Sequence, residues 1–154
     1  MLDEVFSSGG ILTFDPGPHS NFEATHKEMY RFLPISAQAA ANTMQIGANS
    51  IYMVRTEEIY TRIIFWWVLC ALREDCIAPT RQLYCKFKAK DVYAECHRYD
   101  QSALNILMAN HFLFNVSRYT SHHDQLQVMR NAAHQEMLIV CPTGTKEKSA
   151  EYFL

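Results

Sequence analysis

The chain has 154 residues, of which 49% are apolar, and this length and composition predict one domain with a packed core. Its formal net charge is −2, from 14 basic and 16 acidic residues, which gives no electrostatic reason to expect binding to nucleic acid or to an anionic membrane. The longest apolar run, residues 63–72, would span about 15 Å as a helix, half of a bilayer core, so no membrane segment is predicted.

The first elements in chain order are a strand, a loop and a short helix. Residues 11–14 form a short apolar run that predicts a strand, and residues 15–21 are rich in Pro and Gly, which predicts a loop. Thr25 and Glu28 have the spacing of a capping box, so a short helix is expected to begin there. Pro34 is expected to end this helix.

The middle of the chain predicts a strand between two helices. The alanine-rich residues 36–42 predict one or two helical turns, and residues 44–54 predict a buried strand. Within that strand, Gly47-Ala48-Asn49 suggests the close approach of another backbone or of a ligand. Thr56 is the expected N-cap of a helix that runs to about Arg73. This helix is apolar nearly all round, so deep burial is expected.

The last third of the chain continues the alternation. Lysines alternate with apolar residues over 86–90, which predicts a half-exposed strand. Asp100 is the expected N-cap of a helix over residues 101–111, and residues 112–114 and 137–140 predict short strands. The expected buried stripe of this helix is Ala103, Leu104, Leu107 and Met108. Alternating strands and helices predict a layered α/β domain.

The cysteines leave three interpretations open. The chain has five of them: Cys70, Cys76, Cys85, Cys96 and Cys141. Two bridges among the first four allow three connectivities, and bridges would indicate a secretory compartment. Buried free thiols are the second interpretation. Zinc is the third, although the spacing of Cys76, Cys85, Cys96 and His97 fits no standard ligand pair. Asn115-Val116-Ser117 is an N-glycosylation acceptor triplet, which agrees with secretion.

Two stretches carry a resemblance to a known family. They are Trp66-Trp67-Val68-Leu69-Cys70-Ala71-Leu72-Arg73-Glu74-Asp75-Cys76-Ile77-Ala78-Pro79 and Cys96-His97-Arg98-Tyr99-Asp100-Gln101-Ser102-Ala103-Leu104-Asn105-Ile106-Leu107. The chain resembles, over about residues 9–118, an invertebrate family of uncharacterised glycosyltransferase-like proteins. It is also similar, more distantly, to the C-terminal acceptor-side half of GT-A nucleotide-diphospho-sugar transferases. The resemblance implies a single partial GT-A-like (Rossmann-like) domain over residues 1–154, with a mixed sheet and a loose tail at 144–154.

The resemblance also implies the residues of the site. In GT-A enzymes the Asp of the Asp-Gln pair contacts the donor sugar, so Asp100 and Gln101 are the leading catalytic candidates. His97 joins them for acceptor binding or general-base work, because a histidine titrates near neutrality. The substrate-binding candidates are Asn105, His19 and Asn49. Each of these residues also has a structural interpretation, as a helix cap, a packed side chain or a backbone hydrogen-bond partner.

The metal-binding half of such an enzyme is not recognisable. A full-length relative is expected to use Mn²⁺ or Mg²⁺ held by carboxylates, and this sequence contains no Asp-x-Asp and no Gly-rich phosphate loop. No metal ligand is therefore assigned, and His122-His123-Asp124 is not expected to converge on one ion. The nucleotide-binding units of the family lie before Gly9-Gly10 in its pattern. The chain is therefore expected to be a fragment, a mispredicted product or a degenerate relative, and inactive alone.

Three functional hypotheses follow. The first is half of a Golgi glycosyltransferase that takes a nucleotide sugar and a glycan or glycoprotein acceptor in its full-length form. The second is a non-catalytic binding or interaction module of the secretory pathway with the same fold. The third is a cytosolic α/β protein with free thiols. The acidic start Met1-Leu2-Asp3-Glu4 does not resemble a signal peptide, so the lumenal hypotheses expect targeting information upstream.

Overall fold

The computed structural model describes residues 2–14, 16–47 and 50–121, and this part of the chain contains both helices and strands, which confirms the prediction of a mixed α and β domain. The strands are β1 (Ile11–Thr13), β2 (Pro16–Ser20), β3 (Met44–Ile46) and β4 (Ile51–Met53). The α-helices are α1 (Leu2–Ser7), α2 (Ala37–Asn42), α3 (Glu57–Ile59), α4 (Phe65–Ala71), α5 (Glu74–Ile77) and α6 (Tyr99–His111). A π-helical turn spans Tyr60–Ile64, and 3₁₀ helices span Lys27–Arg31 and Val116–Arg118. Asn49, Cys141, His122-His123-Asp124, the strand predicted at 137–140 and the tail at 144–154 lie outside the described residues.

The described strands form two small antiparallel pairs. β1 pairs with β4, with Leu12 opposite Tyr52, and β2 pairs with β3 across an irregular register. The predicted loop at 15–21 is wrong, because most of it is β2. Proline lacks a backbone donor but is tolerated in a strand that pairs on one edge. The single strand predicted at 44–54 is also wrong, because β3 and β4 pair with different partners.

Thr13 gives β1 a second neighbour from far along the chain. Its amide donates to the Tyr119 carbonyl at 2.8 Å, and its own carbonyl accepts from the Ser121 amide at 2.7 Å. The Thr13 hydroxyl also donates to the Tyr119 carbonyl at 2.8 Å. This contact is the isolated parallel bridge between Thr13 and Thr120. The end of the described chain is thereby fixed to its beginning.

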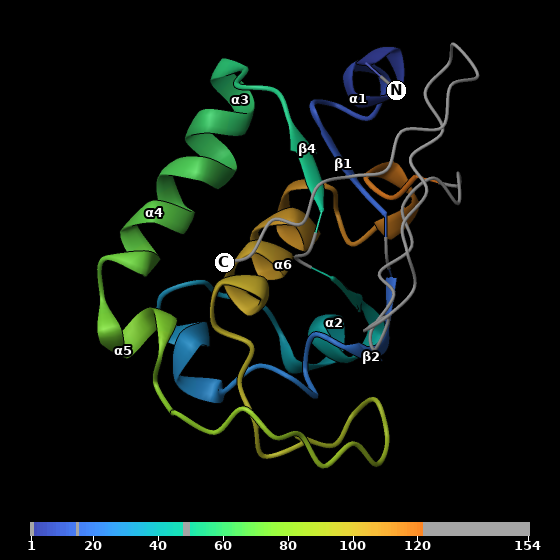
Figure 1. Cartoon of the computed structure of the whole chain (residues 1–154). Helices are drawn as coiled ribbons and strands as arrows, with labels where there is room; N and C mark the ends of the chain where they lie inside the picture. The colour runs from blue at the N-terminus through green and yellow to red at the C-terminus, as the bar shows by residue number, and fades with distance from the viewer. Residues whose placement is uncertain (1, 15, 48–49, 122–154) are drawn as a thin grey trace, which may run out of the picture.

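Helix α6 occupies the centre of the fold, between the α3–α4 rod on one side and the strands on the other (Figure 1). The predicted stripe is confirmed and is wider than expected, since every residue from 102 to 109 is buried. The predicted cap is wrong: α6 begins at Tyr99, and the residue at its N-cap position, Arg98, makes no side-chain capping bond. Asp100 therefore lies inside the first helical turn, with an exposed side chain.

The helix predicted after Thr56 is present as α3, the π-helical turn and α4 in succession. Thr56 is its N-cap, and its hydroxyl accepts from the Ile59 amide at 3.1 Å. Deep burial of the whole rod is wrong. Ile59, Ile63 and Cys70 are buried, whereas Trp66 is 47% exposed and Leu72 is 77% exposed. The rod packs on α6 through one face, so the remaining apolar side chains stay on the surface.

Three local predictions are also corrected. Residues 86–90 are not a strand: Lys86 pairs with Glu95 at 2.7 Å, and its amide donates to the Ala94 carbonyl within an irregular loop. Residues 112–114 are a turn in which Leu113 and Phe114 have positive φ, a conformation that a strand excludes. The Thr25 capping box does not form, since His26 caps the 3₁₀ helix by accepting from the Glu28 amide at 3.4 Å.

The structure selects one of the three disulfide connectivities. Cys70 is bonded to Cys76, and Cys85 is bonded to Cys96, with Cα–Cα distances of 5.2 and 4.9 Å. Both the free-thiol and the zinc interpretations of these four residues are therefore wrong, because disulfide sulfur is not a thiolate ligand. The second bridge closes the segment from residue 85 to residue 96, which we call the disulfide loop. The loop crosses the lower face of the molecule (Figure 1).

Candidate functional site

Gln101 and Asn105 lie one turn apart on α6 and both contact strand β3. The Gln101 side-chain amide donates to the Ile46 carbonyl at 3.0 Å. The Asn105 amide donates to the same carbonyl at 2.9 Å, while its Oδ1 accepts from the Ile46 amide at 2.7 Å. Asn105 is buried. Two of the predicted site residues are therefore brought together, and their polar groups are engaged by the backbone of β3.

His19 joins the same strand from β2. Its Nε2 donates to the Gln45 side-chain oxygen at 2.9 Å, and its ring stacks on Phe87 with centroids 4.6 Å apart. The Gln45 amide donates to the Ser102 hydroxyl at 3.3 Å, and that hydroxyl donates to the Ala24 carbonyl at 3.0 Å. His19, Gln101 and Asn105 thus all contact β3, His19 through the Gln45 side chain and the other two through the Ile46 backbone. Polar contacts of this kind fix the relative placement of the elements they join.

His97 is fully buried, and both of its ring nitrogens contact backbone groups. Nδ1 accepts from the His26 amide at 3.2 Å, and Nε2 donates to the Ile77 carbonyl at 3.1 Å. This pairing places the single proton of the neutral ring on Nε2. Burial lowers the pKa of His97 to about 4, and His26 acts in the same direction. At neutral pH the ring is therefore uncharged and links three segments of backbone.

Asp100 differs from its neighbours because its side chain faces solvent. Its backbone carbonyl accepts from the Trp67 indole nitrogen at 3.2 Å, so the residue joins α6 to α4 through its main chain. The structure thus separates Asp100 from Gln101 in environment, with one carboxylate on the surface and one amide on β3. Asn49, the last predicted substrate contact, lies outside the described residues.

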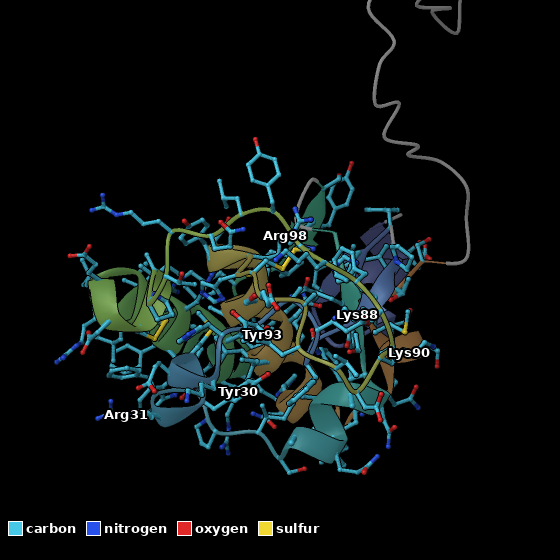
Figure 2. The ribbon with its side chains drawn as sticks, turned by 90° about the horizontal axis from the view of Figure 1, so that it is seen from below. Tyr30, Arg31, Lys88, Lys90, Tyr93 and Arg98 are labelled. Atoms are coloured by element: carbon cyan, nitrogen blue, oxygen red, sulfur yellow. A yellow bond between two sulfur atoms is a disulfide. The ribbon has the colours of Figure 1, made fainter. Side chains whose placement is uncertain are left out.

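The sequence did not predict a cavity with aromatic walls. One lining residue, Thr25, directly follows Ala24, whose carbonyl accepts from Ser102. The volume of the cavity is about 350 Å³, and its lining residues are Phe22, Thr25, His26, Lys27, Tyr30 and Tyr93. Tyr30 belongs to the 3₁₀ helix and Tyr93 to the disulfide loop, and Figure 2 shows both on the lower face of the molecule. The His26 ring meets Tyr93 edge-on, with centroids 6.0 Å apart. We call this space the Tyr30–Tyr93 cavity.

The disulfide loop places Tyr93 at this cavity. The Ala94 amide donates to the Glu23 carbonyl at 2.9 Å, which fixes the loop beside the segment that precedes the 3₁₀ helix. Cys96 and Ala94 are buried against Ala24, and Cys85 packs on the same cluster. No local pattern in the sequence joins Tyr30 to Tyr93. The only sequence signal for the cavity was the cysteine spacing, and it left the connectivity open.

Two residues of the cavity wall, Thr25 and Tyr30, have buried hydroxyl groups that interact with each other. Thr25 is only 2% exposed, and a side-chain hydrogen bond from its hydroxyl acts on the Tyr30 phenol. Neither oxygen has another hydrogen-bond partner among the described residues. Burial raises the pKa of Tyr30 to about 12, an effect that the nearby Thr25 hydroxyl partly offsets. Both oxygens are shielded from solvent, so the wall that a ligand would meet is mainly aromatic.

The polar side chains on the cavity wall include one lysine and no carboxylate. Lys27 and His26 line it, and none of its six lining residues is acidic. Arg31 is nearby in sequence, but its guanidinium is paired with the Glu28 carboxylate at 2.9 Å. Burial raises the pKa of Tyr93, and the Glu95 carboxylate adds to this effect, so this phenol is also protonated at neutral pH.

Comparisons with known proteins add no relative: no protein-family model matches the chain, and no curated protein or solved structure does either. Among the described residues, no three or more histidine, cysteine, aspartate or glutamate side chains are grouped so that they hold a metal ion. None of the described helices has the length and apolar character needed to cross a bilayer.

Proposed function

We propose that this chain is a non-catalytic binding module of the secretory pathway and that the Tyr30–Tyr93 cavity binds a carbohydrate. The observation that carries the proposal is the aromatic wall of the cavity, formed by Phe22, Tyr30 and Tyr93 beside His26 and Lys27. A sugar ring matches this chemistry because its C–H face packs on aromatic rings while its hydroxyls make hydrogen bonds.

The two disulfides support the secretory compartment of the proposal. Two bridges among the described cysteines are typical of oxidising compartments. The resemblance to glycosyltransferase-like proteins further favours the Golgi lumen. We retain a partial GT-A-like layering as the origin of the fold, on the strength of the resemblance over residues 9–118. A relative that lost transfer chemistry but kept sugar recognition fits both the sequence and the cavity.

The non-catalytic part of the proposal rests on how the predicted catalytic side chains are used. Gln101 and His97 are held by backbone groups, and His97 is uncharged at neutral pH. The second candidate function is the acceptor-side half of a glycosyltransferase that takes a nucleotide sugar with Mn²⁺ or Mg²⁺. One observation favours it: the Asp100 side chain, which the resemblance assigns to the donor sugar, is exposed at the start of α6.

Saturation-transfer NMR with methyl glycosides of neutral and acidic hexoses tests the proposal. We expect transfer to at least one glycoside and about a fivefold weaker affinity for Tyr93→Ala, because an aromatic contact contributes about 1 kcal/mol. The matched control is Tyr84→Ala, since Tyr84 is 85% exposed and does not line the cavity.

The opposing outcomes are distinct. Transfer to no glycoside, or binding that Tyr93→Ala and Tyr84→Ala change equally, overturns the carbohydrate site. Turnover of a nucleotide sugar by the wild-type chain with Mn²⁺ overturns the non-catalytic assignment and supports the second candidate. An Asp100→Asn variant then reports whether the exposed carboxylate takes part in that reaction.

A further inference from the structure

The turn after α6 carries the one Asn-x-Ser/Thr triplet of the sequence, Asn115-Val116-Ser117. Asn115 directly precedes the 3₁₀ helix Val116–Arg118 and has extended backbone angles, with φ −90° and ψ 90°. Its side chain is exposed. The triplet is thus presented on the surface at a break between two helices, where an enzyme can reach it.

The geometry inside the triplet prepares the asparagine for modification. The Ser117 hydroxyl donates to the Asn115 Oδ1 at 2.6 Å. This bond engages the carbonyl oxygen of the amide, and the Nδ2 of this exposed residue makes no hydrogen bond to any described residue. N-glycosylation needs that nitrogen as the nucleophile and a hydroxyl two residues later, which is why the acceptor motif ends in Ser or Thr.

Exposed apolar side chains next to the triplet are a surface that a glycan would cover. Leu113 is 77% exposed and Phe114 is 44% exposed, and both precede Asn115 directly. Their positive φ values, 52° and 63°, fix the turn that brings them to the surface. Neighbouring exposed apolar side chains favour association in water. A hydrophilic glycan on Asn115 would cover this pair.

We propose that Asn115 is N-glycosylated in the secretory lumen. The donor is a polyprenyl-diphosphate oligosaccharide: the bond between Nδ2 and the anomeric carbon forms, the bond between that carbon and the diphosphate oxygen breaks, and Nδ2 loses one proton. The lipid diphosphate leaves with the bonding electrons. This inference depends on the two disulfides for the compartment and is independent of the Tyr30–Tyr93 cavity.

The test expresses the full chain in eukaryotic cells behind a supplied signal peptide, beside Asn115→Gln, Ser117→Ala and Ser117→Thr. We expect wild type and Ser117→Thr to shift in mobility on treatment with an amidase that releases N-glycans, and the other two variants not to shift. Release converts Asn115 to Asp, which mass spectrometry of the peptide detects. If Asn115→Gln fails to fold, the test still stands on the two Ser117 variants. Ser117→Ala and Ser117→Thr both keep Asn115 and differ little in size, but only Ser117→Thr keeps the hydroxyl.

An unmodified Asn115 peptide from secreted wild-type chain with both disulfides formed overturns the proposal. A shift that persists in Ser117→Ala also overturns it, because the glycan would then lie elsewhere. Light scattering of the enzymatically deglycosylated chain adds a second measurement: greater self-association than the glycosylated chain is the result expected if the glycan covers Leu113 and Phe114.

Discussion

Asn105 on α6 holds both backbone groups of Ile46 on β3, accepting from the amide at 2.7 Å and donating to the carbonyl at 2.9 Å. Its amide also donates to the Gln101 carbonyl at 2.9 Å within α6. The Asn105 side chain thus makes the two hydrogen bonds to the Ile46 backbone that a neighbouring strand would otherwise make. Its burial makes these bonds difficult to replace with water.

Asn105→Ala is therefore expected to destabilise the fold strongly. The substitution leaves the Ile46 amide buried without its partner, at a cost of about 1–3 kcal/mol. The Ile46 carbonyl loses one of two bonds and keeps the one from Gln101. Urea unfolding monitored by circular dichroism measures the loss. The control is Asn110→Ala, because exposed Asn110 on the same helix makes one bond, to the Pro34 carbonyl at 3.0 Å, and is expected to cost about 1 kcal/mol. Equal losses in the two variants would contradict the role assigned to Asn105.

The buried His97 predicts a specific loss of stability in acid. Its folded pKa of about 4 lies below the ordinary value of 6.5, so the unfolded chain binds the proton more tightly. The stabilisation is present above pH 6.5 and is lost as the pH falls from 6.5 to 4, by on the order of 3 kcal/mol. His111, whose pKa burial also lowers, acts in the same direction.

The His97→Gln variant isolates this effect, because it removes the titrating ring and keeps an amide that can donate to the Ile77 carbonyl. The difference in unfolding free energy between wild type and this variant, measured by urea at pH 7 and at pH 4.5, should shrink in acid. Parallel behaviour of the two proteins over that range would show that His97 does not titrate as its burial predicts.

The two disulfides are expected to differ in their effect on the cavity. Loop closure predicts a loss of about 3 kcal/mol without the Cys85–Cys96 bridge and about 2 kcal/mol without Cys70–Cys76. Only the Cys85–Cys96 bridge anchors the disulfide loop, which carries Tyr93. We therefore expect the Cys85→Ser/Cys96→Ser protein to lose glycoside binding while still folded, and the Cys70→Ser/Cys76→Ser protein to retain it. Equal binding by the two proteins would contradict this anchoring.

Periodicity predicted the elements that local sequence determines. The apolar spacing of α6 and the Thr56 cap of the following rod both identify real helices, and residues 11–14 contain β1. Periodicity does not say which faces of an element are covered. The rod was expected to be buried all round, but only one face meets α6, so Trp66 and Leu72 remain exposed.

The candidate site was harder to predict because its contacts are long-range. The resemblance made Gln101 a catalytic candidate and Asn105 a substrate-binding candidate, yet nothing local showed that β3 would engage both side chains. The alternation at 86–90 resembles a strand, but no described strand pairs with it. Tyr93 lies at the same cavity as Tyr30 because Cys85 is bonded to Cys96, which is one of the three connectivities that the sequence allows. The chemistry of the residues was readable from the sequence, but their partners were not.

The contact of Thr13 with Tyr119 and Ser121 has a consequence for the order of folding. As the chain leaves the ribosome, β1 emerges more than a hundred residues before these hydrogen-bond partners. Its second edge cannot be completed until synthesis has passed Ser121, whereas both disulfides close over short segments and can form earlier. Long-range closure of this kind slows folding. Asn115 would therefore pass the translocation channel before β1 is paired on both sides, while its turn is still open to modification.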